Sequence, residues 1–336
     1  MKKMLVFLCL AAAILPGCKK EAHAQPAFFA KGADIGWLSE MESTGIKFRN
    51  AAGQEEDCIS ILKGVGMNTI RLRVWVNPAD GWSGEEDVIK LASRANTMGM
   101  KLMIDFHYSD WWADPGKQNK PAAWKDMDIP QLLAAISSHT RQVMSSLKRN
   151  GITPAWVQVG NETNDGMLWE TGRASKDMKT FANMINAGYD AVKEVSPTSK
   201  VIVHISNGYN NDLFRWMFDG LTANKAKFDV IGMSLYPDVD KWEEFNNNTL
   251  YNMNDMVNRY GKEVMICEAG MPWDKAGTCR SFLADLIKKV RSIPGNKGLG
   301  VLYWEPECHN NWKGYNMGAF DNSGKPTIAL DAFKEN

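Results

Sequence analysis

Strand-like and helix-like segments alternate along most of the chain, and this alternation limits the possible folds more than any other feature of the sequence. Eight apolar runs are predicted as strands, at residues 33–37, 69–75, 101–106, 156–159, 201–205, 230–235, 264–267 and 300–304. Each is followed by a predicted helix, at residues 55–65, 85–98, 129–150, 176–195, 213–221, 242–260, 281–292 and 328–334. This order indicates an α/β fold with parallel strands.

The number of these units favours a closed barrel. The strands are almost continuously apolar, as in a sheet that is covered on both faces. Eight strand–helix units in 336 residues therefore predict a single-domain (β/α)8 TIM barrel over residues 31–336. A doubly wound open sheet is the alternative, but it would usually carry a glycine-rich phosphate turn after its first strand, and this sequence has none.

The first 18 residues predict export. Lys2 and Lys3 precede an apolar run at residues 4–15, which is too short for a membrane span and typical of a secretory signal. The run ends at Leu15-Pro16-Gly17-Cys18, which resembles a bacterial lipobox. We therefore expect a signal peptide at 1–18, lipidation of Cys18, a tether at 19–30 and an anchor in the cell envelope (outer membrane or cell surface). Ordinary cleavage near residues 22–25 is the alternative.

Composition narrows the classes of partner. Lys plus Arg equals Asp plus Glu at 39 each, which argues against nucleic acid and suits an uncharged substrate. Thirteen tryptophans suggest platforms for sugar rings, although any single Trp is more often a packing residue. Membrane contact is expected only through the lipid anchor. Nothing in the sequence indicates a dimer, so we expect a monomer.

Four cysteines follow the signal segment, and no pair has the spacing of a metal motif. Cys279 and Cys308 come after the seventh and eighth predicted strands, so a disulfide between these neighbouring loops is conceivable. Four separate buried thiols, which include Cys58 and Cys267, are the alternative that we favour.

Polar residues gather where the predicted strands end. Asn161 and Glu162 follow the fourth strand, and Glu268 follows the seventh. Other strands contribute, at or near their ends, Arg73, His107, His204, Tyr236 and Trp304. A lone His or Glu at a strand end is often structural. Structural roles for single residues do not explain why so many polar residues gather at the same edge of the sheet. The carboxyl ends of barrel strands form the active sites of this fold.

Two carboxylates that face each other predict retaining glycoside hydrolysis, in which one is the acid and base and the other is the nucleophile. The acid needs a raised pKa, and the nucleophile must stay ionised beside a cation, for which the sequence suggests Arg73. Tyr236 could hydrogen-bond the nucleophile, and Asn161 could bind the sugar 2-hydroxyl. Metal hydrolysis is the competing chemistry, but HExxH spacing is absent, so we expect no catalytic metal and no cofactor.

The chain resembles glycoside hydrolase family 53, the arabinogalactan endo-β-1,4-galactosidases. The longest matching blocks are DFHYSDWWADPGKQ at 105–118 and VQVGNETNDGMLW at 157–169. Shorter blocks are GADIGW at 32–37, RLRVWVNP at 71–78, PAAW at 121–124, VIGMSLYP at 230–237 and YWEPE at 303–307.

This resemblance implies a retaining endo-hydrolase of β-1,4-galactan, with Glu162 as acid/base and Glu268 as nucleophile. It also implies a shell around the cleaved sugar, made of Arg73, His107, Asn161, His204, Tyr236 and Trp304. Further lining or support is implied for Trp75, Asp110, Trp112, Asp114 and Trp169.

The sequence also departs from the family pattern. An alanine follows Glu268 where the family usually has threonine, and the segment after Glu305 is short. A calcium-binding eighth loop, found in some bacterial relatives, is therefore not expected. Two alternatives stay open: the same mechanism on mannan, xylan or glucan, and a non-catalytic glycan-binding lipoprotein.

Overall fold

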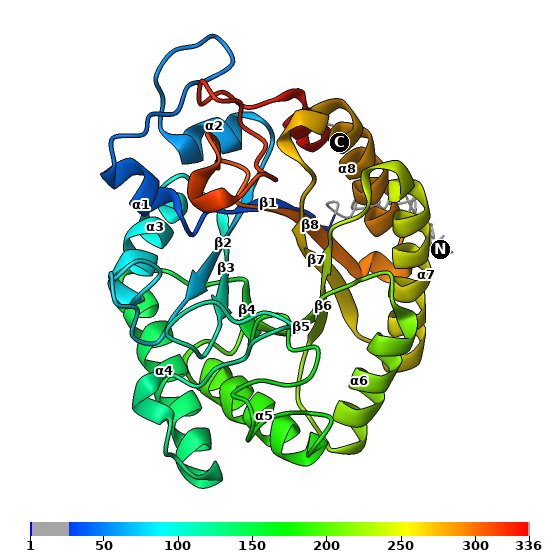
Figure 1. The fold of residues 1–336 in the computed structure, drawn as a ribbon. Helices are drawn as coiled ribbons and strands as arrows, with labels where there is room; N and C mark the ends of the chain where they lie inside the picture. Colours follow the sequence, from blue (N-terminus) through cyan, green and yellow to red (C-terminus); the bar gives the residue numbers. More distant parts are fainter. Residues whose placement is uncertain (2–26, 335–336) are drawn as a thin grey trace.

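The computed structural model describes residue 1 and residues 27–334, so the predicted signal segment and Cys18 lie outside the described residues. Eight parallel strands form a closed barrel in the order β1 to β8, because β8 pairs with β1. Helices surround this barrel as an outer ring (Figure 1). The predicted (β/α)8 architecture is confirmed.

The strands of the barrel are β1 (Ala30–Asp34), β2 (Thr69–Val74), β3 (Lys101–Phe106), β4 (Trp156–Val159), β5 (Lys200–Ile205), β6 (Val230–Leu235), β7 (Glu263–Ala269) and β8 (Gly298–Trp304). The helices are α1 (Leu38–Ser43), α2 (Cys58–Gly64), α3 (Glu85–Thr97), α4 (Ile129–Arg149), α5 (Met178–Val195), α6 (Asn211–Ala223), α7 (Trp242–Tyr260) and α8 (Ala276–Arg291).

Several elements differ from the sequence prediction. Strand β1 ends at Asp34 instead of 37, and α8 begins at Ala276 instead of 281. Helix α1 was not predicted, because it has only six residues and no side-chain cap at its start. Helix α2 begins at Cys58 rather than Glu55, since the Asp57 side chain accepts the Ser60 N–H at 2.9 Å and fixes the first turn there. The last segment, η6 (Ile328–Phe333), is a 3-10 helix instead of the predicted α-helix, and its apolar side chains are buried.

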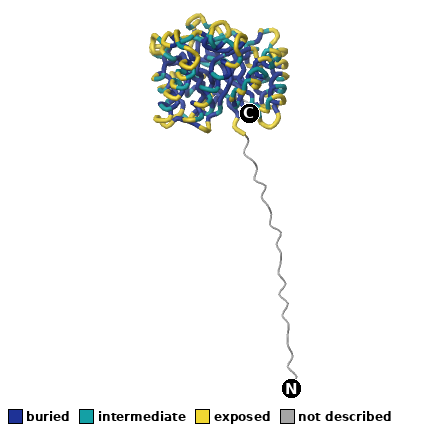
Figure 2. Tube along the Cα trace, turned by 90° about the horizontal axis from the view of Figure 1, so that it is seen from below, coloured by how far each residue is buried: buried dark blue, intermediate teal, exposed yellow. Residues whose placement is uncertain are grey.

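The barrel interior is apolar at one end and polar at the other. Near the amino ends of the strands, residues from several strands form a buried inner cluster that includes Met103, Trp156, Ile202 and Met265. A separate, larger core fills the space between the strands and the helices. Figure 2 shows buried positions through the interior and exposed positions at the outer surface. This packing closes the amino-terminal end and leaves polar side chains for the carboxyl-terminal end.

Strand β7 contains a bulge at Cys267. Its neighbour β6 pairs Met233 with Ile266 but the next residue, Ser234, with Glu268, so Cys267 is an extra residue in β7. Met265 and Cys267 belong to the inner cluster, and Ile266 belongs to the outer core. If side chains alternated strictly along β7, Glu268 would point outward like Ile266. The bulge restores Glu268 to the inside of the barrel.

All four described cysteines are free and buried. This agrees with separate thiols rather than with a bridge between Cys279 and Cys308. Within residues 27–334, no helix combines the length and the apolar character that a membrane span requires.

Gly232 gives the bulge its space, and this makes a stability prediction. A Cβ atom at Gly232 would lie 2.8 Å from the Cys267 Sγ atom and 2.7 Å from the Ile202 Cγ2 atom. We expect Gly232→Ala to lower the free energy of unfolding by about 1–3 kcal/mol in urea titrations, because the closed interior cannot relax.

Gly277→Ala is the matched control. Gly277 lies in α8, and a Cβ atom at this position would have no other atom within 4 Å. Alanine is the better helix former, so this variant should keep or slightly raise stability. Equal effects of the two substitutions would contradict the role given to Gly232.

Candidate active site

A buried arginine, Arg71, forms the floor of the site. Its guanidinium contacts the carboxylates of Asp34 at 2.7 Å, Asp105 at 2.9 Å and Glu268 at 2.9 Å. Its Nε–H donates to the Gln158 Oε1 atom at 2.7 Å. Burial alone would raise the pKa of Asp105, but Arg71 and then His107 outweigh it and lower that pKa. Arg71 therefore collects negative charge at the centre of the barrel mouth.

Glu268 is held from two sides. Arg71 approaches one carboxylate oxygen, and the Tyr236 hydroxyl donates to the other at 3.0 Å, as the sequence suggested. Burial raises the pKa of Glu268 above its ordinary value, and Arg71 and the Tyr236 hydrogen bond oppose this rise. Both contacts favour the ionised carboxylate that a nucleophile requires.

Glu162 has a different environment. It lies three residues beyond β4, and its φ of 44° places it in the left-handed region that residues with a side chain seldom adopt. The Ser234 hydroxyl donates to its Oε1 atom at 2.7 Å, and no cation contacts its carboxylate within the described part of the chain. Desolvation first, and the charge of Glu268 second, raise the pKa of Glu162 to about 8.

The two glutamates share one strand as their common support. Ser234, which contacts Glu162, is the sheet partner of Glu268 across the β6–β7 pair. Neighbouring strands lie about 4.8 Å apart, so the Glu162 carboxyl is fixed next to the residue beside Glu268. Retaining glycosidases hold their two carboxyl groups about 5–5.5 Å apart, and this arrangement is compatible with that separation.

His204 supports Glu162 through Ser234. Its Nε2 atom lies 2.8 Å from the Ser234 Oγ atom, and its Nδ1 atom lies 3.0 Å from the Gln158 Nε2 atom. Burial, and then Arg71, lower the pKa of His204 well below its ordinary value, so the ring is neutral. With Ser234 donating to Glu162, we assign the His204 proton to Nε2.

The suggestion that Arg73 is the cation beside Glu268 is wrong, because Arg71 occupies that position. Arg73 instead forms an ion pair with Glu305 and lies 3.6 Å from Asp34. Its guanidinium packs against the ring of Trp112 at 4.4 Å. Both arginines point into the barrel from β2, two residues apart. Arg71 lies nearer the centre and contacts Glu268.

Two other predicted shell residues are buried and fully engaged. The His107 Nε2 atom lies 3.0 Å from Asp105, and its Nδ1 atom accepts the Ala113 N–H at 3.1 Å. Asn161 accepts from Arg71 at 2.9 Å and donates to the Ala113 carbonyl at 2.9 Å. These contacts bring both side chains to the rim of the Arg71 network.

Aromatic side chains form a wall beside Arg73. Trp112 and Trp304 are partly exposed and each packs against the buried Trp37, at 5.3 and 5.2 Å between ring centroids. Trp75 is almost fully buried beneath Trp111, at 4.6 Å, so Trp111 presents its ring to solvent with 48% exposure. Trp75 was predicted from the sequence as a lining residue, whereas Trp111 was not.

Three predicted lining residues stabilise loops. The Asp110 carboxylate accepts the backbone N–H groups of Asn77 and Ala122 at 3.0 and 2.8 Å. Asp114 accepts the Gly116 N–H at 2.9 Å and closes a turn.

Trp169 belongs to the same group of loop residues. Its indole N–H donates to the Asp165 carbonyl at 2.8 Å, and the Arg173 guanidinium lies 3.9 Å from its ring. Hydrogen bonds to the backbone thus account for all three positions, and none of the three contacts Glu162 or Glu268 in these interactions.

Comparison with known proteins agrees with the family resemblance seen in the sequence. A family model described as glycosyl hydrolase family 53 matches residues 30–333. An arabinogalactan endo-β-1,4-galactanase of Humicola insolens is 33% identical over 333 aligned residues, which cover 90% of this chain and 98% of its own. An endo-β-1,4-galactanase of Bacillus subtilis (strain 168) is 32% identical over 321 residues, covering 85% and 72%.

A solved structure from a study of two fungal β-1,4-galactanases is also similar. It superposes with a TM-score of 0.86 at 29% identity and covers 92% of this chain and all of its own. The glycoside hydrolase family 53 catalytic domain of Ignisphaera aggregans gives 0.83 at 30% identity, with 93% and 97% covered. The family match spans nearly all of the barrel, and the chain therefore belongs to glycosyl hydrolase family 53.

Proposed function

We propose that this protein is a retaining endo-β-1,4-galactanase in which Glu162 is the general acid and base and Glu268 is the nucleophile. The observation that carries the proposal is the contrast between two neighbouring carboxyl groups. Glu268 contacts Arg71 and Tyr236, whereas Glu162 has only a neutral hydroxyl partner and a pKa raised to about 8. Such a pair provides a proton donor and an anion at the same pH.

The reaction follows from these two states. Glu162 donates its proton to the glycosidic oxygen while a Glu268 oxygen attacks the anomeric carbon, which breaks the bond to the leaving sugar and forms a glycosyl ester. The Glu162 carboxylate then takes a proton from water as the water attacks the same carbon. This second step releases the sugar with its original anomeric configuration and restores both groups.

The choice of galactan rests on the family relatives. The relatives from Humicola insolens and Bacillus subtilis are described as galactanases, and both align over most of this chain. Structures of a mannosidase and of xylanases are also similar, but at 13–16% identity they show only a shared fold. The exposed ring of Trp111 and the partly exposed rings of Trp112 and Trp304 would provide surfaces on which sugar rings stack.

We also propose export and lipidation of Cys18. Support comes from the signal-like residues 1–18 and from the place where the described chain begins. Phe28 packs on Trp156 near the amino end of β4, at 6.1 Å between ring centroids, whereas the glutamates lie at the other end of the barrel. An anchor there would leave the site open to a polysaccharide. Fatty-acid labelling that persists in Cys18→Ser would contradict lipidation.

The hydrogen bonds to the two glutamates predict the pH profile of kcat/KM. Glu162 must be protonated to act, so activity should fall as pH rises through about 8. Ser234 lowers the pKa of Glu162, so Ser234→Ala should move this basic limb to higher pH. Tyr236 lowers the pKa of Glu268, which must be ionised, so Tyr236→Phe should move the acidic limb to higher pH.

Ser206→Ala is the control for this experiment. The Ser206 hydroxyl accepts from Asn164 at 2.7 Å and contacts neither glutamate in the hydrogen bonds of the described residues. Both limbs should stay in place in this variant. If Ser234→Ala and Tyr236→Phe shift the same limb, the assignment of the two roles fails.

The substrate proposal is tested with β-1,4-galactan, mannan, xylan and glucan, by measuring new reducing ends over time. We expect galactan to be cleaved fastest, with long oligosaccharides first, as internal cleavage requires. Glu162→Gln protein, purified in the same way, controls for contaminating enzymes and should lose roughly 10²–10⁴-fold in rate. Faster cleavage of another glycan would reject galactan, and binding without cleavage would support a glycan-binding protein instead.

A further inference from the structure

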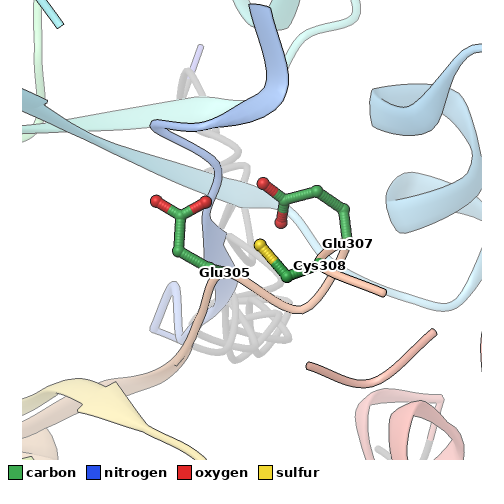
Figure 3. A group of neighbouring side chains, drawn as sticks. All are labelled: Glu305, Glu307 and Cys308. Carbon is green, nitrogen blue, oxygen red and sulfur yellow. The ribbon is translucent and has the colours of Figure 1, made fainter. Parts of the chain in front are cut away.

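A second buried cluster lies directly after β8, outside the pair of catalytic candidates. Glu305, Glu307 and Cys308 each offer one donor atom, and these three atoms lie within 4.8 Å of one another. The two glutamates are fully buried and Cys308 is 2% exposed. Figure 3 shows the Cys308 sulfur pointing toward the space between the two carboxyl groups.

Glu307 has no hydrogen-bond donor. Both of its carboxyl oxygens are buried and lack a partner, and it is the one carboxyl group in residues 27–334 of which this is true. The Glu305 carboxylate beside it accepts from Arg73 and from the Trp37 N–H, so it is an acceptor too. A buried ion without a partner is very unfavourable. A proton or a metal ion between Glu305 and Glu307 would remove this cost.

The donors in the cluster favour a metal ion over a shared proton. Five buried carboxyl groups, Asp34, Asp105, Glu268, Glu305 and Glu307, lie around two guanidiniums, Arg71 and Arg73. Burial raises the pKa of Asp34 and of Glu307 well above their ordinary values, so each needs a proton or another cation. A proton shared by Glu305 and Glu307 would satisfy both carboxyl groups but leave the thiol without a role, whereas a divalent cation uses all three donors.

We propose that Glu305, Glu307 and Cys308 form a structural site for a borderline divalent metal ion such as Zn²⁺. Zinc binds carboxylate oxygen at about 2.0–2.2 Å and thiolate sulfur at about 2.3 Å, which places tetrahedral donors roughly 3.5 Å apart. The three donor atoms, which lie within 4.8 Å of one another, would draw together around the ion. The sulfur ligand selects zinc or cobalt over calcium and magnesium, which prefer oxygen. The Cys308 thiol gives up its proton when it binds.

The site would stabilise the fold around the substrate wall. Glu305 holds both Arg73 and the Trp37 backbone, and Trp304 precedes it at the end of β8. A metal on Glu305 would therefore link the β8 loop to β2 and to the segment after β1. It would not touch the Glu162 and Glu268 carboxylates, so chelation should lower thermal stability before it lowers activity at moderate temperature.

The test uses the purified full chain, first stripped with a chelator and then titrated with Co²⁺ alone. We expect one equivalent to bind and to produce a thiolate-to-cobalt charge-transfer band, and Zn²⁺ to displace the cobalt and raise the melting temperature. Cys308→Ser should abolish the band, and Glu307→Gln should weaken binding roughly tenfold or more. Cys279→Ser, at another buried free thiol, should leave the band unchanged.

Three outcomes would overturn the proposal. The first is the absence of a bound equivalent and of any band in the wild-type chain, which is independent of how well the variants fold. The second is a band that survives in Cys308→Ser but disappears in Cys279→Ser. The third is a Glu307→Gln chain with unchanged stability and no effect of metal, which would show that the two carboxyl groups share a proton.

Discussion

The interaction of Arg71 with three buried carboxylates is the constraint on which the rest of this site depends. Four strands that meet at the barrel mouth bring an acidic or amide group to this guanidinium: Asp34 from β1, Asp105 from β3, Gln158 from β4 and Glu268 from β7. Removing one partner from such a buried network typically costs about 3–5 kcal/mol, because the remaining charges stay buried. Arg71 thus shapes the barrel mouth and favours the ionised form of Glu268.

Glu268 and Glu162 differ in their contacts with the Arg71 network. Glu268 contacts Arg71 directly, whereas Glu162 is hydrogen-bonded by the neutral Ser234–His204 pair. Strand β6 and the residue after it support both, with Ser234 contacting Glu162 and Tyr236 contacting Glu268. Arg73 serves another purpose, because it joins Glu305 to the tryptophan wall. The two arginines of β2 therefore have separate partners: Arg71 contacts Glu268, and Arg73 supports the aromatic wall.

Much of this could be predicted from the sequence, because barrel strands are apolar runs that end in polar residues at a common edge. The eight strands, the two glutamates and the Tyr236 hydrogen bond were accessible in this way. The choice between Arg71 and Arg73 was not, since both point inward and only the depth of the barrel decides which reaches Glu268. The bulge at Cys267 could not be predicted either, because it breaks the alternation from which side-chain direction is inferred.

The predicted lining at Asp110, Asp114 and Trp169 could not be separated from loop support without knowing which backbone N–H groups and carbonyls lie nearby. The Glu305–Glu307–Cys308 cluster has no recognisable metal spacing and forms only when the turn after β8 is folded.

The central claim is that Glu268, beside Arg71, is the group that attacks the sugar, and covalent trapping tests it most directly. A 2-deoxy-2-fluoro galactosyl compound with a good leaving group should form a slowly hydrolysed glycosyl ester with the enzyme. Mass spectrometry after proteolysis should then find the added mass on the peptide that contains Glu268, and on Glu268 itself. A label on Glu162, on Glu305 or on any other residue would contradict the account.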